Sequence, residues 1–335
     1  MKKIFLVFVC ATALLSSDEY DCFYEAPPYD ADLFRRDEQV FSGHLSFLYW
    51  RVEEGGLDYA LKMQHAPAPG IGYAQGEYER ATFDGDPGFR AALGFFRALH
   101  YWEIWFQYTR MTSRGEDTVY APRDPARFLV GTWPEDGPLS RATSHIHLNY
   151  NVGDFLADRF VNPNPHLRAR FLGGATIAWI NQNWMVRYYQ DDTVSSQIQN
   201  RWKYIAGGLR IGSSFDWFCG YDLYLSGGVT FATLLGSYHN IARQTVHALD
   251  LPIRDAHYFD IRPTFAIQAM FGLSWQKNFC ANRVEAFAGY EINTWFNLAE
   301  SYRSTPGSAM SAKETIINSA LLCLQGLTAR VSVDF

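Results

Sequence analysis

The last ten residues of the chain constrain its fold most, because residues 326–335 alternate between apolar and polar side chains without a break. The apolar positions are Leu327, Ala329, Val331, Val333 and Phe335, and the polar positions are Thr328, Arg330, Ser332 and Asp334. Successive side chains of a β-strand point to opposite faces, so this pattern predicts a strand with one apolar and one polar face. Such a strand at the end of a chain is typical of barrels that span a bacterial outer membrane. We therefore expect the barrel-assembly machinery to bind the chain through Phe335.

The first seventeen residues have the pattern of a secretory signal peptide. Two lysines precede an apolar run over residues 4–15, and two serines follow at the expected cleavage point. The run is too short to cross a bilayer as a helix, and Val9 is too bulky to favour lipidation at Cys10. We expect export of the chain and removal of residues 1–17.

The remaining chain has no segment that approaches the roughly twenty apolar residues of a membrane helix, and its mean hydropathy is -0.18. A membrane-spanning chain without such helices must form a closed barrel. The aromatic content of 16% suits the interfacial girdles of a barrel. The net charge of -6 provides no basic surface for nucleic acid. Residues 18–41 are acidic and contain adjacent prolines, which predicts an N-terminal periplasmic segment with room for a first strand, and residues 42–335 are predicted to form the barrel.

Alternating segments recur along the chain and predict about eleven visible strands. They cover residues 44–52, 57–63, 89–95, 102–109, 145–152, 167–179, 203–211, 217–235, 259–275, 284–293 and 326–335. Gly55 and Gly56 are predicted to join the first two strands as a hairpin. The alternation slips near Gly153, which predicts a bulge. Several strands exceed ten residues, and this length favours a tilted membrane strand over a soluble β-sandwich.

The connections between these segments are alternately short and long, as in barrels with tight periplasmic turns and long external loops. Long connections are predicted near residues 65–76, 113–141, 190–200, 237–256 and 300–317. By this count both the first visible strand and the last run toward the periplasm. A single-chain antiparallel barrel normally has an even number of strands, so one more is expected between residues 22 and 41. The prediction is an all-β transmembrane antiparallel β-barrel of about twelve strands, with a range of ten to sixteen.

A succession of local sequences adds a resemblance to a known family. They are Phe47-Leu48-Tyr49-Trp50, Gly88-Phe89-Arg90, Trp102 to Thr109, Asn149-Tyr150-Asn151, Ala178-Trp179-Ile180-Asn181-Gln182, Gly289-Tyr290-Glu291 and Leu324-Gln325-Gly326-Leu327-Thr328. In this order they resemble the Legionella-type major outer membrane protein family, also found as MOMP-like porins in relatives of the Chlamydiales. The resemblance covers nearly the whole mature chain. It implies a pore-forming barrel that admits small hydrophilic solutes, and it brings no catalytic motif.

If the apolar strand faces meet lipid, the opposite faces line the lumen. This assigns seven arginines to the lumen: Arg90, Arg168, Arg170, Arg210, Arg262, Arg283 and Arg330. It also assigns seven acidic residues: Asp58, Glu103, Asp222, Asp260, Glu285, Glu291 and Asp334. Equal numbers of the two signs predict weak ion selectivity. An ion pair that only stiffens the barrel wall is an equally good interpretation of each of these residues.

Two further groups were considered as chemical sites. His145 and His147 share a strand face and could hold a metal, but no third ligand is placed by spacing, so polar residues without a metal are the better interpretation. Asp255 and His257 are compatible with a hydrolase, but the sequence contains no nucleophile elbow or ordered triad. We predict no enzyme activity, no cofactor and no metal.

Four cysteines remain after the leader: Cys22, Cys219, Cys280 and Cys323. Export allows disulfides to form, and the spacing does not suggest a zinc site. Cys219 and Cys280 are predicted at the periplasmic rim, two strands or about 10 Å apart, which is too far for an unstrained bridge. Cross-links to Cys22 or to neighbouring molecules, which the similar chlamydial porins make attractive, and free thiols all stay open.

The predicted function is an outer-membrane porin for passive, weakly selective diffusion of small hydrophilic solutes and ions. Its expected partners are outer-membrane lipid and these solutes, with a homo-oligomer left open. The alternative is a structural or adhesive surface barrel whose long external loops bind host or envelope partners. An open lumen would favour the porin, whereas a lumen blocked by the N-terminal segment or by an infolded loop would favour the alternative.

Overall fold

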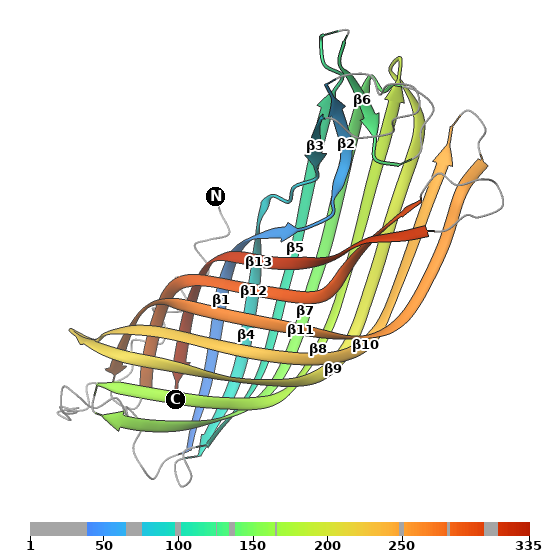
Figure 1. The fold of residues 1–335 in the computed structure, drawn as a ribbon. Helices are drawn as coiled ribbons and strands as arrows, with labels where there is room; N and C mark the ends of the chain where they lie inside the picture. Colours follow the sequence, from blue (N-terminus) through green and yellow to red (C-terminus); the bar gives the residue numbers. More distant parts are fainter. Residues whose placement is uncertain are drawn as a thin grey trace.

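The described part of the chain folds almost entirely into β-strands (Figure 1). The computed structural model describes residues 39–64, 76–97, 102–124, 126–133, 138–164, 166–247, 251–279, 282–304 and 314–335. The strands are β1 (Gln39–Glu54), β2 (Asp58–Met63), β3 (Gly76–Arg80), β4 (Gly85–Arg97), β5 (Trp102–Tyr120), β6 (Phe128–Gly131), β7 (Arg141–Asn164), β8 (Leu167–Gln190), β9 (Thr193–Gly220), β10 (Leu223–Val246), β11 (Leu251–Phe279), β12 (Asn282–Ser304) and β13 (Glu314–Asp334). No helix in the described part of the chain is long and apolar enough to cross a bilayer.

Ten of these strands close into one antiparallel barrel, in the order β1-β13-β12-β11-β10-β9-β8-β7-β5-β4. Ten lies within the predicted range of ten to sixteen and is two below its central number of twelve. Successive paired residues, followed once around the barrel from Ser42, lead back to β1 at Glu54, twelve positions further along the same strand. A stagger of this size requires strands tilted by about 40° to the barrel axis.

The remaining three strands form a separate small sheet, in the order β3-β2-β6. The predicted hairpin of β1 and β2 is therefore wrong. Both edges of β1 are already paired, one with β13 and the other with β4, so β2 has no free edge of β1 to join. The prediction that the first and last strands run in the same direction is also wrong, because β1 runs antiparallel to β13. The error arose because residues 57–63 were counted as a barrel strand, and one extra strand reverses the direction of the strand before it. The predicted strand between residues 22 and 41 contributes only Gln39 to Phe41, as the start of β1, and residues 1–38 lie outside the described part.

The outer face of the barrel is apolar only in the half that carries the described chain ends, here called the membrane half. On β9, Phe215, Leu209 and Ile205 are exposed on this face, whereas Lys203 and Arg201 follow in the other half, here called the outer half. The apolar stretch of β9 spans roughly 30 Å along the barrel axis at ~3.3 Å per residue and the tilt given above, enough to cross the hydrocarbon core. Lipid therefore surrounds only the membrane half.

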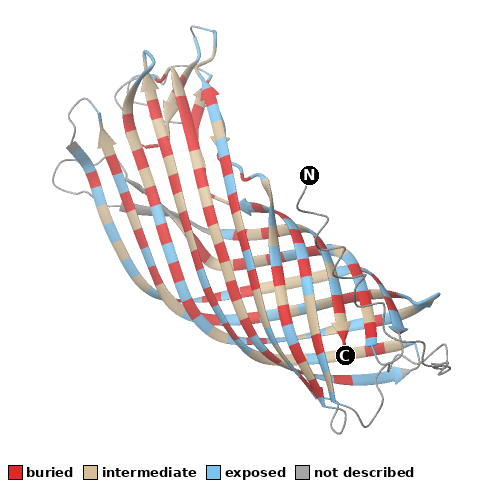
Figure 2. Ribbon diagram, turned by 180° about the vertical axis from the view of Figure 1, so that it is seen from behind, coloured by how far each residue is buried: buried red, intermediate tan, exposed pale blue. Residues whose placement is uncertain are grey.

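The inner face has the opposite order of polarity. On β9 the inward side chains of the membrane half include Asp216 and Arg210, and those of the outer half include the large apolar or aromatic Tyr204, Trp202 and Ile198 besides the smaller polar Asn200 and Ser196, all of them buried. Buried and exposed residues alternate along the strands in both halves (Figure 2). Each face changes polarity because the membrane half has lipid outside and polar groups inside, whereas the outer half has water outside and an apolar core inside.

The bulge predicted at Gly153 is not present. The polarity of each strand face changes near this residue, and in the sequence this change looks like a slip in the alternation. The pairing of β7 with β5 and with β8 continues through Gly153 without a shift in register. Tyr150 and Val152 point inward in the outer half, and Asp154 follows them on the same face in the membrane half. The strand alternates regularly, and only the environment of each face changes.

The connections at the end of the membrane half are two to four residues long. At the other end, long connections join β1 to β4 and β5 to β7, as predicted. The long loop predicted at residues 190–200 is wrong, because β8 and β9 continue to a two-residue turn at Asp191 and Asp192. The loop predicted at residues 237–256 is likewise mostly strand, since β10 and β11 extend through it. Polar side chains on the outside of the outer half were mistaken for loop residues.

The turn between β9 and β10 is expected to become more stable when its residues suit its backbone. Tyr221 and Asp222 both have positive φ, 54° and 62°, and a two-residue hairpin turn of this kind favours Asn-Gly. Tyr221→Asn with Asp222→Gly should raise the free energy of unfolding by about 1 kcal/mol, because the left-handed conformation is unfavourable for ordinary residues. Urea unfolding of the refolded protein in lipid vesicles measures this change. The matching replacement of Asp191 and Asp192 should act in the same direction, and a lower urea midpoint for both variants would contradict the explanation.

Candidate functional site

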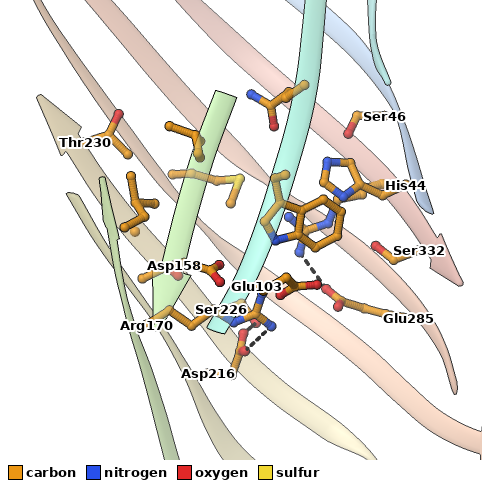
Figure 3. Close-up of a pocket in the computed structure, with 18 of the residues that line it drawn as sticks. His44, Ser46, Glu103, Asp158, Arg170, Asp216, Ser226, Thr230, Glu285 and Ser332 are labelled. Carbon is orange, nitrogen blue, oxygen red and sulfur yellow. Dashed lines mark hydrogen bonds and ion pairs between the residues drawn. The ribbon is translucent and has the colours of Figure 1, made fainter. Parts of the chain in front are cut away.

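The lumen of the membrane half contains a polar cavity of about 180 Å³ (Figure 3). All ten barrel strands contribute residues to its lining. Its charged lining residues are five arginines, Arg90, Arg170, Arg210, Arg283 and Arg330, and five acidic residues, Glu103, Asp158, Asp216, Glu285 and Asp334. The two sets balance, so the cavity has no net formal charge from them.

The charged side chains that lie nearest to the short turns of the membrane half form ion pairs with one another. Arg168 and Arg170 on β8 both approach Asp216 on the neighbouring β9, with Nη2 to Oδ2 distances of 2.8 and 3.5 Å. Figure 3 shows Arg170 and Asp216. Arg330 on β13 donates to Glu285 on β12 at 2.6 Å. Since the pairs lie within a buried lumen, removing one member would leave the other charge without compensation.

A chain of hydrogen bonds crosses the lumen above these pairs. Arg90 on β4 makes two bonds to Glu291 on β12, of 2.6 and 3.0 Å, and Arg210 on β9 lies 3.2 Å from Asp154 on β7. Gln268 on β11 joins the two pairs, because it donates to Glu291 at 2.5 Å and accepts from Arg210 at 3.0 Å. Five strands from different sides of the barrel are connected in this way. These side chains reach across the lumen, and those of Arg90, Arg210 and Gln268 also line the cavity.

Opposite walls of the barrel touch one level further toward the outer half. Strands β7 and β12 are five strands apart in either direction around the barrel. Asn293 of β12 donates to the hydroxyl of Tyr150 of β7 at 2.9 Å, and the rings of Tyr150 and Trp295 meet edge to face at 6.0 Å. Gln182 of β8 also reaches Glu54 of β1, at 3.2 Å. We call Tyr150, Asn293 and Trp295 the central contact, since they bridge the lumen near its middle.

The small sheet packs onto the inner face of β8 in the outer half. Tyr188 donates its hydroxyl to the carbonyl oxygen of Tyr59 in β2 at 2.6 Å, and Trp133, just after β6, meets Trp184 at 5.1 Å. Burial, together with the nearby carboxylates Asp117 and Glu79, raises the pKa of the Tyr59 phenol, so it stays protonated. The sheet thus extends the apolar core of the outer half.

Most residues predicted for the lumen are found there. Those buried inside the barrel or lining the cavity are Arg90, Glu103, Arg168, Arg170, Arg210, Arg262, Arg283, Glu285, Glu291, Arg330 and Asp334. Asp260 is half-exposed and lies 3.4 Å from the buried Arg262. Asp222 is a wrong prediction, because it lies exposed in the turn after β9. Asp58 is also wrong, because it belongs to the small sheet and bonds Arg80.

The acidic partners Asp154, Asp158 and Asp216 and the apolar contents of the outer half were not predicted from the sequence. Asp154 and Asp158 were assigned to no face, because the predicted strand ended at residue 152 and a bulge was expected near Gly153. Asp216 was placed in a turn, although β9 continues to Gly220. A switch in polarity along one uninterrupted face was the signal that could have located all three.

The other candidate groups that the structure describes lie on the outer wall of the barrel. The described residues contain no cluster of three or more metal-ligating side chains, and His145 and His147 lie on the outer wall. Asp255 contacts His257 at 3.3 Å and Arg243 at 2.9 Å. Of the cysteines, Cys219 and Cys323 are free, while Cys22 and Cys280 lie outside the described residues. Disulfides that involve the latter two stay a prediction.

The fold and the lumen define a transmembrane β-barrel of the bacterial outer membrane. The chain belongs to the family described as the Legionella pneumophila major outer membrane protein precursor, which matches residues 37–335. The resemblance noted in the sequence is thereby confirmed. In outer-membrane barrels the short turns face the periplasm, so the outer half described above projects outside the cell.

Solved structures offer only distant similarities. The outer membrane protease OmpT from Escherichia coli has a TM-score of 0.43 and 8% identity, over 88% of this chain and 96% of that chain. A FadL homologue from Pseudomonas aeruginosa has a TM-score of 0.25 and 8% identity, over 89% and 90%. The TodX monoaromatic hydrocarbon channel has a TM-score of 0.23 and 7% identity, over 89% and 90%. No curated protein matches the sequence. These similarities carry no argument about the chemistry of this chain.

Proposed function

We propose that this outer-membrane protein acts at the cell surface through its outer half, and that its barrel is an anchor whose lumen is closed to hydrophilic solutes. The central contact is the observation that carries the proposal. Closure is supported by the hydrogen bond of 2.9 Å between opposite walls and by Tyr150 and Trp295, which are at most 1% exposed. Packed interiors of this kind leave no room for water, let alone for a sugar or an amino acid.

The size of the barrel supports the same proposal. Side chains just fill the interior of an eight-stranded barrel, whereas porins with sixteen to eighteen strands leave an aqueous channel. Ten strands are much closer to the filled case. A barrel of this width with Trp50, Trp184 and Trp295 pointing inward has its lumen occupied by its own side chains.

The outer half supplies the surface on which such a protein would act. It has its own apolar core and the small sheet, and the long connections from β1 to β4 and from β5 to β7 extend from it. A folded body held above the membrane suits the binding of a host molecule or of another envelope component. The membrane half would then serve to hold this body in place.

The second candidate function is a porin for small hydrophilic solutes and ions. The polar cavity in the membrane half favours it, because charged side chains from seven of the ten strands surround a space of about 180 Å³ that could hold water and ions. Passage through the whole barrel would require the central contact to separate. A channel of this kind would open only intermittently and would show little preference between cations and anions.

Conductance of the refolded protein in a planar bilayer distinguishes the two functions. We expect a folded barrel, recognised by heat-modifiable migration on gels, that shows no steady channels. Steady channels in the wild type, with an ion preference that changes in the Arg170→Gln variant, would instead contradict the proposed anchor function and support the porin function. Arg51→Gln is the matched control, since Arg51 is an exposed arginine on the outside of β1.

A further inference from the structure

A cationic surface lies on the outside of the barrel directly above the apolar band. Arg201 and Lys203 of β9 are exposed there, and neither has an ion-pair partner among the described residues. The outward positions of β7, β8, β9 and β10 in the outer half carry no acidic residue. This is unexpected from composition, because the chain as a whole has a net charge of -6. An unneutralised group of cations on an otherwise acidic protein indicates a negatively charged partner.

Hydrogen-bonding side chains surround these cations. In the ladder between β8 and β9, Asn181 is opposite Lys203 and Asn183 is opposite Arg201, and His147 of β7 is opposite Asn183. Side chains at directly opposite positions lie about 5 Å apart. His147, Asn181, Asn183 and Arg201 line one hollow in the outer wall, and Lys203 lies beside it, opposite Asn181. The hollow can therefore donate several hydrogen bonds to one bound group, in addition to its positive charge.

The apolar band begins immediately below the cations. Ile205 follows Lys203 at the next outward position of β9, about 7 Å away along the strand, and Leu209 continues the same face. On the neighbouring β8, Trp179 lies below Asn181 in the same way. A molecule with a phosphate at the cations would thus have its acyl chains against these apolar side chains.

We propose that this surface binds the phosphate groups of the phosphorylated glycolipid that forms the outer leaflet of the membrane. Lysine and arginine make charge-assisted hydrogen bonds to phosphate, and the arginine guanidinium can bind two of its oxygens at once. The amides of the hollow match the hydroxyl groups of a sugar head group. A single lipid molecule would contact charge, amide and apolar band together, which neither a free phosphate nor a neutral lipid can do.

Lipid A binding by the refolded full-length protein in zwitterionic detergent tests the proposal. Arg201→Gln with Lys203→Gln should weaken the binding of bisphosphorylated lipid A by roughly thirty-fold, since each cation near an anionic head group contributes about a factor of five. Lipid A from which both phosphates have been removed should bind the wild type about as weakly as the phosphorylated form binds this variant. The affinity should also fall as salt is added.

The matched control removes the same charge elsewhere on the outer face. Arg51→Gln with Arg97→Gln replaces two exposed arginines on β1 and β4 and should leave lipid A affinity unchanged. Equal losses in the two double variants, or equal binding of dephosphorylated lipid A, would overturn the proposal. Competition by inorganic phosphate at equal concentration, or equal affinity for phosphatidylglycerol, would also overturn it, because the surface would then recognise any phosphate or any anionic lipid.

Discussion

Replacing Tyr150 and Trp295 together with alanine is expected to turn a silent barrel into one that conducts ions steadily. The two side chains bridge opposite walls at the central contact, and both are almost completely buried. Their removal leaves Asn293 without its partner and opens a gap directly above the cavity of the membrane half. Water can enter this gap from the cavity because the amide of Asn293 can bind it. An ion that reaches the gap then meets a cavity with balanced charges.

Single-channel recording in planar bilayers measures this result, with heat-modifiable migration as the check that each variant is folded. The same substitution also removes two large buried side chains, so the free energy of unfolding should fall by at least about 3 kcal/mol. Trp179→Ala with Tyr290→Ala is the matched control, because these residues face outward and are 40 and 47% exposed. It should remain silent. A folded Tyr150→Ala/Trp295→Ala barrel that stays equally silent would mean that the lumen is closed at another level.

Replacing Glu291 with alanine is expected to lower the free energy of unfolding by about 3 to 5 kcal/mol, because it leaves the guanidinium of Arg90 buried without its counter-charge. Glu291 is completely buried, and it accepts two hydrogen bonds from Arg90 and one each from Gln268 and Thr328. All three donors would lose their acceptor at once.

Urea unfolding in lipid vesicles, followed by tryptophan fluorescence, measures the loss. Arg90→Met with Glu291→Leu removes both charges and should recover most of the stability, since an apolar pair of similar volume can replace a buried ion pair. Glu53→Gln is the control at an exposed position and should change the free energy of unfolding by less than about 0.5 kcal/mol. A loss below about 1 kcal/mol for Glu291→Ala would mean that water reaches Arg90 in the lumen.

In the membrane half, the alternation of apolar and polar residues correctly predicted the strands and which of their faces points inward. The final strand, the alternation of residues 102–109 and the arginines at 90, 168 and 283 all predicted elements and faces that the structure contains. In this half the pattern is unambiguous, because lipid outside and polar groups inside impose opposite requirements on neighbouring residues of a strand. The rule that apolar faces meet lipid is sufficient there.

The same rule failed in the outer half. Tyr150, Ile180 and Trp202 are apolar or aromatic and point inward, whereas His147, Asn181 and Arg201 point outward into water. A strand in the outer half alternates as regularly as one in lipid, so alternation alone does not tell which face is inside. Polar outward residues near 190–200 consequently appeared to be a loop, and residues 57–63 appeared to be a barrel strand.

The sequence by itself determined that this chain is a transmembrane antiparallel barrel, and which charged residues share a strand face. Both properties follow from the alternation of side chains between the two faces of a strand, which depends only on residues close together in the sequence. Only the tertiary structure decided that there are ten strands, that β2 leaves the barrel, and that the central contact joins opposite walls. Strand number and lumen contacts depend on which distant segments pair and on how far the barrel extends beyond the lipid. Residues such as Tyr150 and Asn293, far apart in the chain, meet only after the barrel has closed.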